Sequence, residues 1–203
     1  NFAILGESLF TGKETMETIK GSYTRDALRV GMELSHSEGF NPFKFGVIGS
    51  SDSHNASSPS EENNYTGKLP MLDGSAGLRT DQALRLPEGI NPVTRWGSGG
   101  LAAVWAEENT RESIFDALGR KETYATSGPR IALRFFSGWH FSAAMLKQNN
   151  FIEQAYAGGV PMGGELLAGP KNQAPAFVII AAKDPLGANL DRVQIIKAWI
   201  DKN

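Results

Sequence analysis

The sequence has 203 residues, of which 40% are hydrophobic and 23 are glycine, so its composition excludes wholesale disorder and collagen-like repetition. Its length fits one large domain or two small ones, and its formal net charge of −2 gives no indication of binding to nucleic acid or to an acidic membrane. The absence of cysteine excludes a disulfide framework, a thiolate zinc site and a cysteine nucleophile.

The first predicted element is an amphipathic helix over residues 22–38. Ala27, Val30 and Leu34 recur at helical spacing, and Thr24 and Gly39 are suited to cap its two ends. After a turn at residues 41–42, the aromatic and β-branched residues of 43–49 predict a buried strand. Polar residues follow this strand directly. The carboxyl ends of strands are where α/β folds build active sites, so this position is a candidate site.

Residues 55–100 are rich in Ser, Asn, Gly and Pro and predict a long irregular excursion, which either lines a site or is a plain insertion. Regular structure returns with a short strand predicted over residues 101–106. A capping pattern formed by Asn109 and Glu112 then begins a second predicted helix, which ends near Gly119.

The residues after 124–129 predict a β-rich C-terminal part. Strands are expected over residues 131–136, 177–182 and 193–200, with one short helix over 149–156 and a loop at 184–187 between two strands. We therefore place a domain boundary near Gly128. Residues 1–128 then form part of an α/β domain with the excursion at about 55–100, and residues 129–203 form an incomplete β-rich extension.

No segment of the chain is suited to span a membrane. The longest apolar run, residues 174–182, contains Pro175 and is far too short, and no charged-then-apolar leader opens the sequence. We therefore expect a soluble protein, cytoplasmic or periplasmic. The first residue is Asn1, and a turn-like cluster at 201–203 follows an apolar strand pattern, so we expect a piece of a longer polypeptide.

Asp52 and His54 are the best candidates for chemistry. A carboxylate and an imidazole two residues apart in an extended segment lie on one side of the chain, where both can bind one divalent cation. The alternative is that Asp52 forms an Asx-turn and His54 is a solvated loop residue. The only other histidines are His36, near the end of the predicted helix, and His140, so no second histidine-rich motif completes a multi-metal site.

Two basic residues, Lys68 and Arg130, are weaker candidates for binding an anionic substrate. Arg130 follows Ser127 and Gly128 at a predicted turn, where backbone amides and a guanidinium could hold phosphate. The alternative is a turn with an exposed arginine. No glycine-rich loop with a Walker lysine is present, so a nucleoside triphosphate site is unsupported.

Several motifs resemble those of a bacterial family of PHP-like metallohydrolases, where PHP stands for polymerase and histidinol phosphatase, and in particular a domain-of-unknown-function family within that group. The resemblance spans nearly the whole chain. It rests on residues 41–54 (NPFKFGVIGSSDSH), 99–108 (GGLAAVWAEE), 111–118 (RESIFDAL), 124–130 (YATSGPR) and 158–165 (GGVPMGGE).

The resemblance implies an α/β fold, the terminal part of a distorted PHP-type β/α barrel, and hydrolysis of a phosphoester or related bond by metal-activated water. Asp52 and His54 would match the final Asp-x-His ligand motif of divalent zinc, manganese or iron. The family's early His-x-His motif and its middle ligands are absent, which implies that the missing N-terminal part of the same protein supplies them. The chain alone is then expected to bind metal poorly and to be inactive, and the substrate would be a small phosphorylated molecule.

Two alternatives remain open from the sequence. In a non-catalytic binding or structural module, Asp52 and His54 only shape a turn, and Trp96, Trp105, Trp139 and Trp199 pack a core or contact a ligand. A serine hydrolase has little support, because no Gly-x-Ser-x-Gly pattern accompanies the serines near His54.

Overall fold

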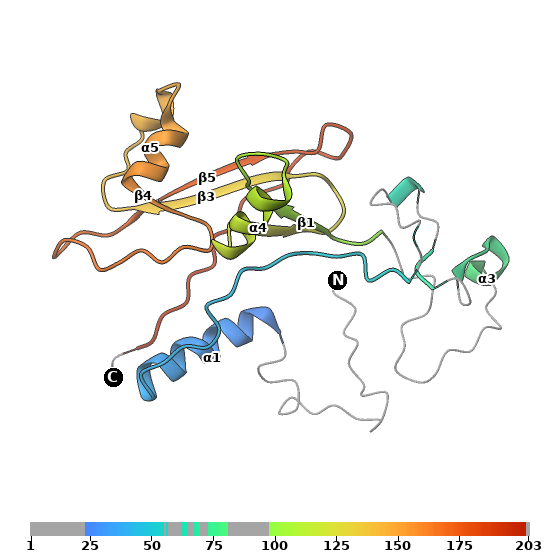
Figure 1. The fold of residues 1–203 in the computed structure, drawn as a ribbon, viewed down its shortest axis with the longest axis horizontal. Helices are drawn as coiled ribbons and strands as arrows, with labels where there is room; N and C mark the ends of the chain where they lie inside the picture. Colours follow the sequence, from blue (N-terminus) through green and yellow to red (C-terminus); the bar gives the residue numbers. More distant parts are fainter. Residues whose placement is uncertain are drawn as a thin grey trace. The chain divides into compact units, whose positions relative to one another are not determined.

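The computed structural model describes residues 23–54, 56, 62–64, 67–69, 73–80 and 98–201. The chain divides into two compact units. The first consists of Asn1–Lys44, Asp52–Ser98 and Arg192–Asn203, and the second of Phe45–Ser51 and Gly99–Asp191. Gly128, where the sequence analysis places a domain boundary, lies within the second unit. Figure 1 shows the helices and strands of both units, with α1 in the first and all the β-strands in the second.

In the first unit, helix α1 spans Thr24–Ser37 and confirms the first predicted helix. Its N-cap is Tyr23, in an extended conformation and without a side-chain hydrogen bond, so the predicted capping by Thr24 is wrong. The helix does end as predicted, because Gly39 adopts φ +79°, a left-handed conformation that glycine tolerates best. Gly31 is the buried residue of the helix, and Asn41 packs so closely on it that a larger side chain would clash.

The second unit contains a two-stranded antiparallel sheet with one helix between its strands. Strand β1 (Leu101–Val104) pairs with β2 (Thr123–Thr126), with Leu101 opposite Thr126. Helix α4 (Arg111–Gly119) connects them, and Thr110 rather than the predicted Asn109 caps it by accepting a hydrogen bond from the Ser113 amide at 3.3 Å. Both β1 and α4 were predicted, whereas β2 was not.

A three-stranded antiparallel sheet with the order β4-β3-β5 completes the second unit. Its strands are β3 (Ala132–Gly138), β4 (Gly159–Pro161) and β5 (Ala176–Ala182); α5 (Phe151–Gly158) and a 3-10 helix, η3 (Met145–Lys147), lie between β3 and β4 in the chain. Phe136, Met145, Ala155 and Val178 form the core, and Phe141, Phe151, Ile152 and Ile180 pack against it. The predicted strands at 131–136 and 177–182 and the predicted helix at 149–156 are therefore confirmed.

The prediction of a buried strand over residues 43–49 is wrong. The segment contains no assigned strand, and Phe45, Val47 and Ile48 are 40–58% exposed. Residues 45–51 belong to the second unit, where two hydrogen bonds join them to β2 and to the residue before β1: Thr123 Oγ1 donates to the Val47 carbonyl at 2.9 Å, and the Gly100 amide donates to the Ser50 carbonyl at 3.0 Å. Aromatic and branched side chains favour a strand only where neighbouring strands cover them, and these contacts leave its apolar side chains exposed.

The predicted strand at residues 193–200 is also wrong. This segment pairs with no strand in the described part of the chain, and Val193, Ile195, Ile196 and Trp199 are 57–68% exposed. The predicted loop at 184–187 is confirmed, since the Gly187 amide donates to the Asp184 carbonyl at 3.0 Å, but only β5 flanks it.

The predicted irregular excursion at 55–100 is described only in part. Within this segment the structure describes a 3-10 helix, η1 (Glu62–Asn64), a short helix, α3 (Ala76–Thr80), and a few neighbouring residues, and the rest lies outside the described residues.

The predicted class of the fold, mixed α and β, is confirmed. Across the described ranges no helix has the length and apolar character needed to cross a membrane.

Candidate functional site

Three of the four predicted site residues, Asp52, His54 and Lys68, lie close together in the first unit. Asp52 Oδ1 lies 3.8 Å from His54 Nε2, and Asp52 Oδ2 forms an ion pair with Lys68 Nζ at 2.6 Å. Asp52 and His54 are 62% and 58% exposed, so both side chains are accessible from solvent. Asp52 adopts φ +51°, so the segment is not a regular strand, and the two side chains meet through this left-handed conformation rather than through strand alternation.

Backbone hydrogen bonds connect this cluster to a loop built around Asp73. The His54 amide donates to the Lys68 carbonyl at 2.9 Å, which joins the two segments. Asp73, fully buried, accepts from the Lys68 amide at 2.7 Å and from the Leu69 amide at 2.8 Å through its two carboxylate oxygens. Lys68 is therefore fixed at its backbone, and its side chain reaches Asp52 from a defined position.

Asp73 is not among the residues predicted to form a site. The available signal was the Asp73-Gly74 pair, which is typical of a turn. That signal predicts a turn but not the partners of its carboxylate.

The ammonium group of Lys68 lowers the pKa of the Asp52 carboxyl, first through their hydrogen bond and then through charge attraction. Desolvation of the carboxyl, the second-largest cause, opposes this effect, but the pKa stays lowered because the hydrogen bond from Lys68 is the largest cause. Asp52 is therefore ionised at neutral pH and available as an oxygen ligand. An exposed ion pair of this kind contributes little to folding stability.

The distance between Asp52 and His54 is compatible with binding one cation. Protein oxygen and nitrogen ligands lie about 2 Å from zinc, so two ligand atoms on one ion are separated by at most about 4 Å. Asp52 Oδ1 and His54 Nε2 satisfy this limit at 3.8 Å. In the described ranges no group of three or more His, Cys, Asp or Glu side chains could complete the site. Asp52 and His54 are therefore placed to supply two ligands of a cation site.

Arg130, the fourth predicted residue, belongs to the second unit, whereas Asp52, His54 and Lys68 belong to the first. Its backbone amide donates to Asp184 Oδ2 at 2.6 Å, and the Leu186 amide donates to Asp184 Oδ1 at 3.0 Å. These two backbone bonds, the Arg130 bond first, lower the pKa of Asp184. The Arg130 backbone thus closes the loop after β5, and its role in substrate binding stays a prediction.

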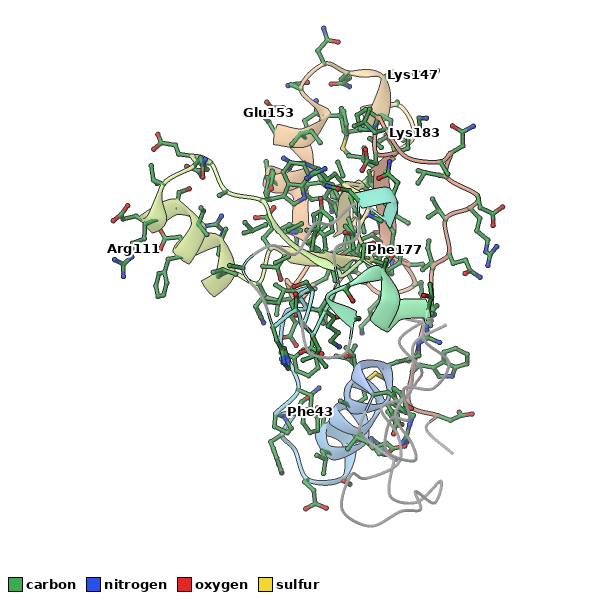
Figure 2. All side chains as sticks on the ribbon, turned by 90° about the vertical axis from the view of Figure 1, so that its right-hand side faces the viewer. Phe43, Arg111, Lys147, Glu153, Phe177 and Lys183 are labelled. Atoms are coloured by element: carbon green, nitrogen blue, oxygen red, sulfur yellow. The ribbon has the colours of Figure 1, made fainter. Side chains whose placement is uncertain are left out.

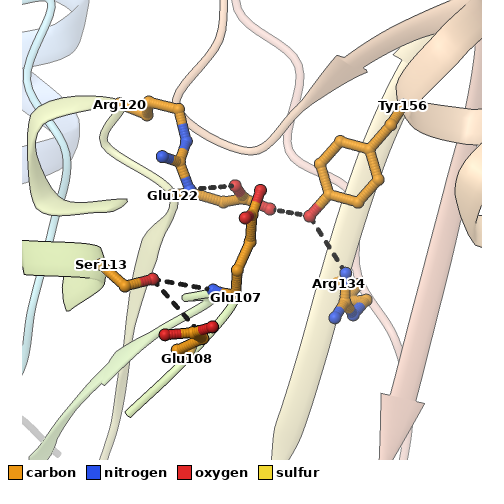
Figure 3. A network of polar contacts seen from close by, with 7 residues as sticks. All are labelled: Glu107, Glu108, Ser113, Arg120, Glu122, Arg134 and Tyr156. Carbon is orange, nitrogen blue, oxygen red and sulfur yellow. Dashed lines mark hydrogen bonds and ion pairs between the residues drawn. The ribbon is translucent and has the colours of Figure 1, made fainter. Parts of the chain in front are cut away.

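A second group of polar side chains, which the sequence analysis did not identify, lies in the second unit (Figure 3). Glu122 is only 3% exposed and accepts a hydrogen bond from the Tyr156 hydroxyl. Arg134 Nη1 donates to that hydroxyl at 3.1 Å, and Arg120 Nη2 lies 3.7 Å from Glu122 Oε2. Burial first, and the Glu122 carboxylate second, raise the pKa of Tyr156, so its hydroxyl remains protonated and donates to Glu122.

This polar network is attached to rigid elements. Glu122 directly precedes β2, Arg134 lies in the middle of β3, and Tyr156 lies on α5. The Arg134 guanidinium stacks on the ring of Trp105, 3.6 Å from its centroid, and Trp105 Nε1 donates to the Leu133 carbonyl at 2.8 Å. The one sequence signal is a charged residue inside the apolar β3 pattern. Its partners are far apart in sequence and could not be inferred.

Comparisons with known proteins give one match. The whole chain, residues 1–203, matches the model of a protein family whose description is "Protein of unknown function (DUF3604)". No curated protein and no solved structure matches the chain.

Proposed function

The chain belongs to the DUF3604 family of proteins of unknown function, and we propose that it is part of a metal-dependent hydrolase in which Asp52 and His54 bind a divalent cation. The observation that carries this proposal is the approach of two accessible ligand atoms, Asp52 Oδ1 and His54 Nε2, to 3.8 Å. An ionised carboxylate and an imidazole suit zinc, manganese or iron. The remaining ligands would come from residues other than these two.

The proposed substrate is a small molecule with a phosphoester or related bond. A divalent cation bound at such a site lowers the pKa of a bound water and balances the charge that develops on a phosphoryl oxygen. Lys68 supports an anionic substrate, because its ammonium group lies beside the same carboxylate. In a loaded site, Lys68 would leave Asp52 to the cation and be free to contact the substrate.

The β/α barrel implied by the family resemblance is part of this proposal. The strand pairs that the structure describes are all antiparallel, whereas barrels of this type are built mainly from parallel strands. The barrel strands would therefore come from other segments than β1 to β5. The antiparallel sheet of β3, β4 and β5 would be an addition to the barrel.

Substitution of Lys68 is expected to strengthen metal binding. Its ammonium group competes with a cation for Asp52, and exposed ion pairs contribute up to about 1 kcal/mol, so Lys68→Ala should tighten Mn²⁺ binding about two- to fivefold. Free Mn²⁺ measured by electron paramagnetic resonance gives the affinity. Lys147→Ala, at the end of the 3-10 helix η3, is the control and should change nothing, since Lys147 is exposed (Figure 2).

The same titration tests the ligands themselves. Asp52→Ala and His54→Ala should each weaken Mn²⁺ binding, and unchanged binding in both variants would remove the two residues from the proposal. Hydrolysis is tested in the longest natural polypeptide that contains this sequence, with p-nitrophenyl phosphate as the substrate. Activity there should require Mn²⁺ or Zn²⁺ and should be lost in Asp52→Ala.

A non-catalytic binding module is the second candidate. One observation favours it: Trp105 contacts Arg134 at a pocket in the second unit, as expected for an aromatic residue that helps to bind a ligand. Trp139 instead donates to the Leu167 carbonyl at 3.1 Å, Trp199 is exposed, and Trp96 lies outside the described residues. Ligand binding that needs no metal, together with no metal binding at Asp52, would favour this function.

A further inference from the structure

A pocket of about 530 Å³ lies beside the polar network of the second unit. Its polar wall contains Arg120, Glu122, Arg134 and Tyr156, and Trp105, Ile152 and Pro161 contribute apolar surface. This volume is within the range of pockets that bind small molecules, which have a mostly apolar lining and a few fixed polar groups. The pocket is formed only by residues of the second unit and does not involve Asp52 or His54.

Arg134 contributes a positive charge to this pocket. Its guanidinium lies over the Trp105 ring and donates one hydrogen bond to the Tyr156 hydroxyl. Among the residues that the structure describes, no carboxylate forms an ion pair with it. A guanidinium has five N–H donors in a planar fork that matches a carboxylate or a phosphate, so most of the donors of Arg134 remain available to a ligand.

The other arginine of the pocket, Arg120, already forms an ion pair with Glu122. Arg120 Nη2 faces Glu122 Oε2 at 3.7 Å, and the buried Glu122 also accepts from Tyr156. Arg134 reaches Glu122 only through the Tyr156 hydroxyl, so it keeps its positive charge toward the pocket. Because Trp105 and Tyr156 fix its orientation before any ligand arrives, little side-chain entropy would be lost on binding.

The acidic residues of the pocket limit the charge of the ligand. Glu122 lies in the wall, and Glu107 lies at the exposed rim, where its backbone amide donates to Ser113 Oγ at 3.1 Å (Figure 3). The carboxylates of these two pocket-lining residues would repel a doubly charged phosphate more than a singly charged carboxylate. The apolar lining favours a ligand with a hydrophobic body.

We propose that this pocket binds a small organic monocarboxylate with an apolar body, whose carboxylate pairs with the guanidinium of Arg134 while its body contacts Trp105 and Ile152. The site goes beyond the proposed hydrolase function, because it requires neither a metal nor Asp52 and His54. A loss of metal binding would therefore leave it unaffected.

Nuclear magnetic resonance titrations of the full chain test this site with four probes: benzoate, butyrate, n-butylamine and inorganic phosphate. Benzoate and butyrate should shift the Trp105 indole N–H signal in a saturable way, and both should bind more tightly than phosphate. Butylamine has a similar body but a positive charge and should not saturate. No saturable shift with either carboxylate up to tens of millimolar, or tighter binding of phosphate or butylamine, would overturn the proposal.

Variants assign the binding to Arg134. A hydrogen bond to a charged group contributes about 1.5–3 kcal/mol, so Arg134→Gln should weaken benzoate binding about ten- to hundredfold. Glu107→Gln should tighten it, because one repelling carboxylate is removed. Arg111→Gln is the matched control, since Arg111 is exposed at the start of α4 and points away from the sheets (Figure 2), and it should bind as the unchanged protein does.

Two results would contradict the assignment to Arg134. One is unchanged binding in folded Arg134→Gln, and the other is weaker benzoate binding in Glu107→Gln. If Arg134→Gln does not fold, as judged by circular dichroism, Glu107→Gln and the order of the four probes still decide.

Discussion

Phe136→Ala is expected to lower the free energy of unfolding of the second unit by about 3–5 kcal/mol. Phe136 is 1% exposed in the central strand β3, where it lies opposite Pro161 of β4 and Val178 of β5. Its ring also packs edge-to-face on Tyr156, with 5.0 Å between centroids. Removal of the ring would leave a cavity bordered by both neighbouring strands and by α5, and urea unfolding followed by circular dichroism measures the loss.

Phe115→Ala is the matched control for this substitution. Phe115 lies on α4 of the same unit but is 72% exposed, so its truncation should change the free energy of unfolding by no more than about 0.5 kcal/mol. Similar losses in the two variants would mean that the core does not lie around β3.

Glu122→Ala is expected to destabilise the second unit by about 1–3 kcal/mol, because removal of one partner leaves a polar group of the network without its acceptor. The Tyr156 hydroxyl would lose the carboxylate to which it donates, and Arg120 would lose its ion pair. Arg120 is half exposed, so water compensates its loss and the Tyr156 hydroxyl dominates the effect. Thermal and urea unfolding report the change.

Glu122→Gln separates the charge of this side chain from its shape. The amide oxygen can still accept from Tyr156, so the loss should be smaller than in the alanine variant. In Glu122→Ala the pKa of Tyr156 should fall toward its ordinary value but remain raised, because burial, the larger cause, is retained. A tyrosine absorbance titration measures this shift. An unchanged Tyr156 pKa together with unchanged stability would contradict the described hydrogen bond.

Local patterns in the sequence were sufficient for the three longer helices, α1, α4 and α5, and for the strands β1, β3 and β5, but not for α3 or the 3-10 helices. The spacing of Ala27, Val30 and Leu34 predicted α1, and the apolar runs predicted β3 and β5, because these signals depend on residues close in sequence. The segments at 43–49 and 193–200 have equally strong strand patterns, but neither is assigned as a strand. Strand formation depends on a partner, which the sequence of the segment itself does not contain.

The candidate sites show the same division between local and distant signals. The Asp52-x-His54 spacing was visible in the sequence, and the structure places both side chains together with Lys68. The network of Glu122, Arg134 and Tyr156 was not visible, because its members are 12 to 34 residues apart and meet only through the packing of α5 and β3. Asp73 was missed because its role consists of bonds to backbone amides.

The central claim is that Asp52 and His54 bind one cation together, and the broadening of histidine proton signals by Mn²⁺ tests it most directly. The chain contains three histidines, and His36 and His140 are exposed like His54, so they serve as internal controls. We predict that substoichiometric Mn²⁺ broadens the imidazole signals of His54 well before those of the other two, and that Asp52→Ala abolishes this selectivity. Equal broadening of all three histidines, or unchanged selectivity in Asp52→Ala, would contradict the account.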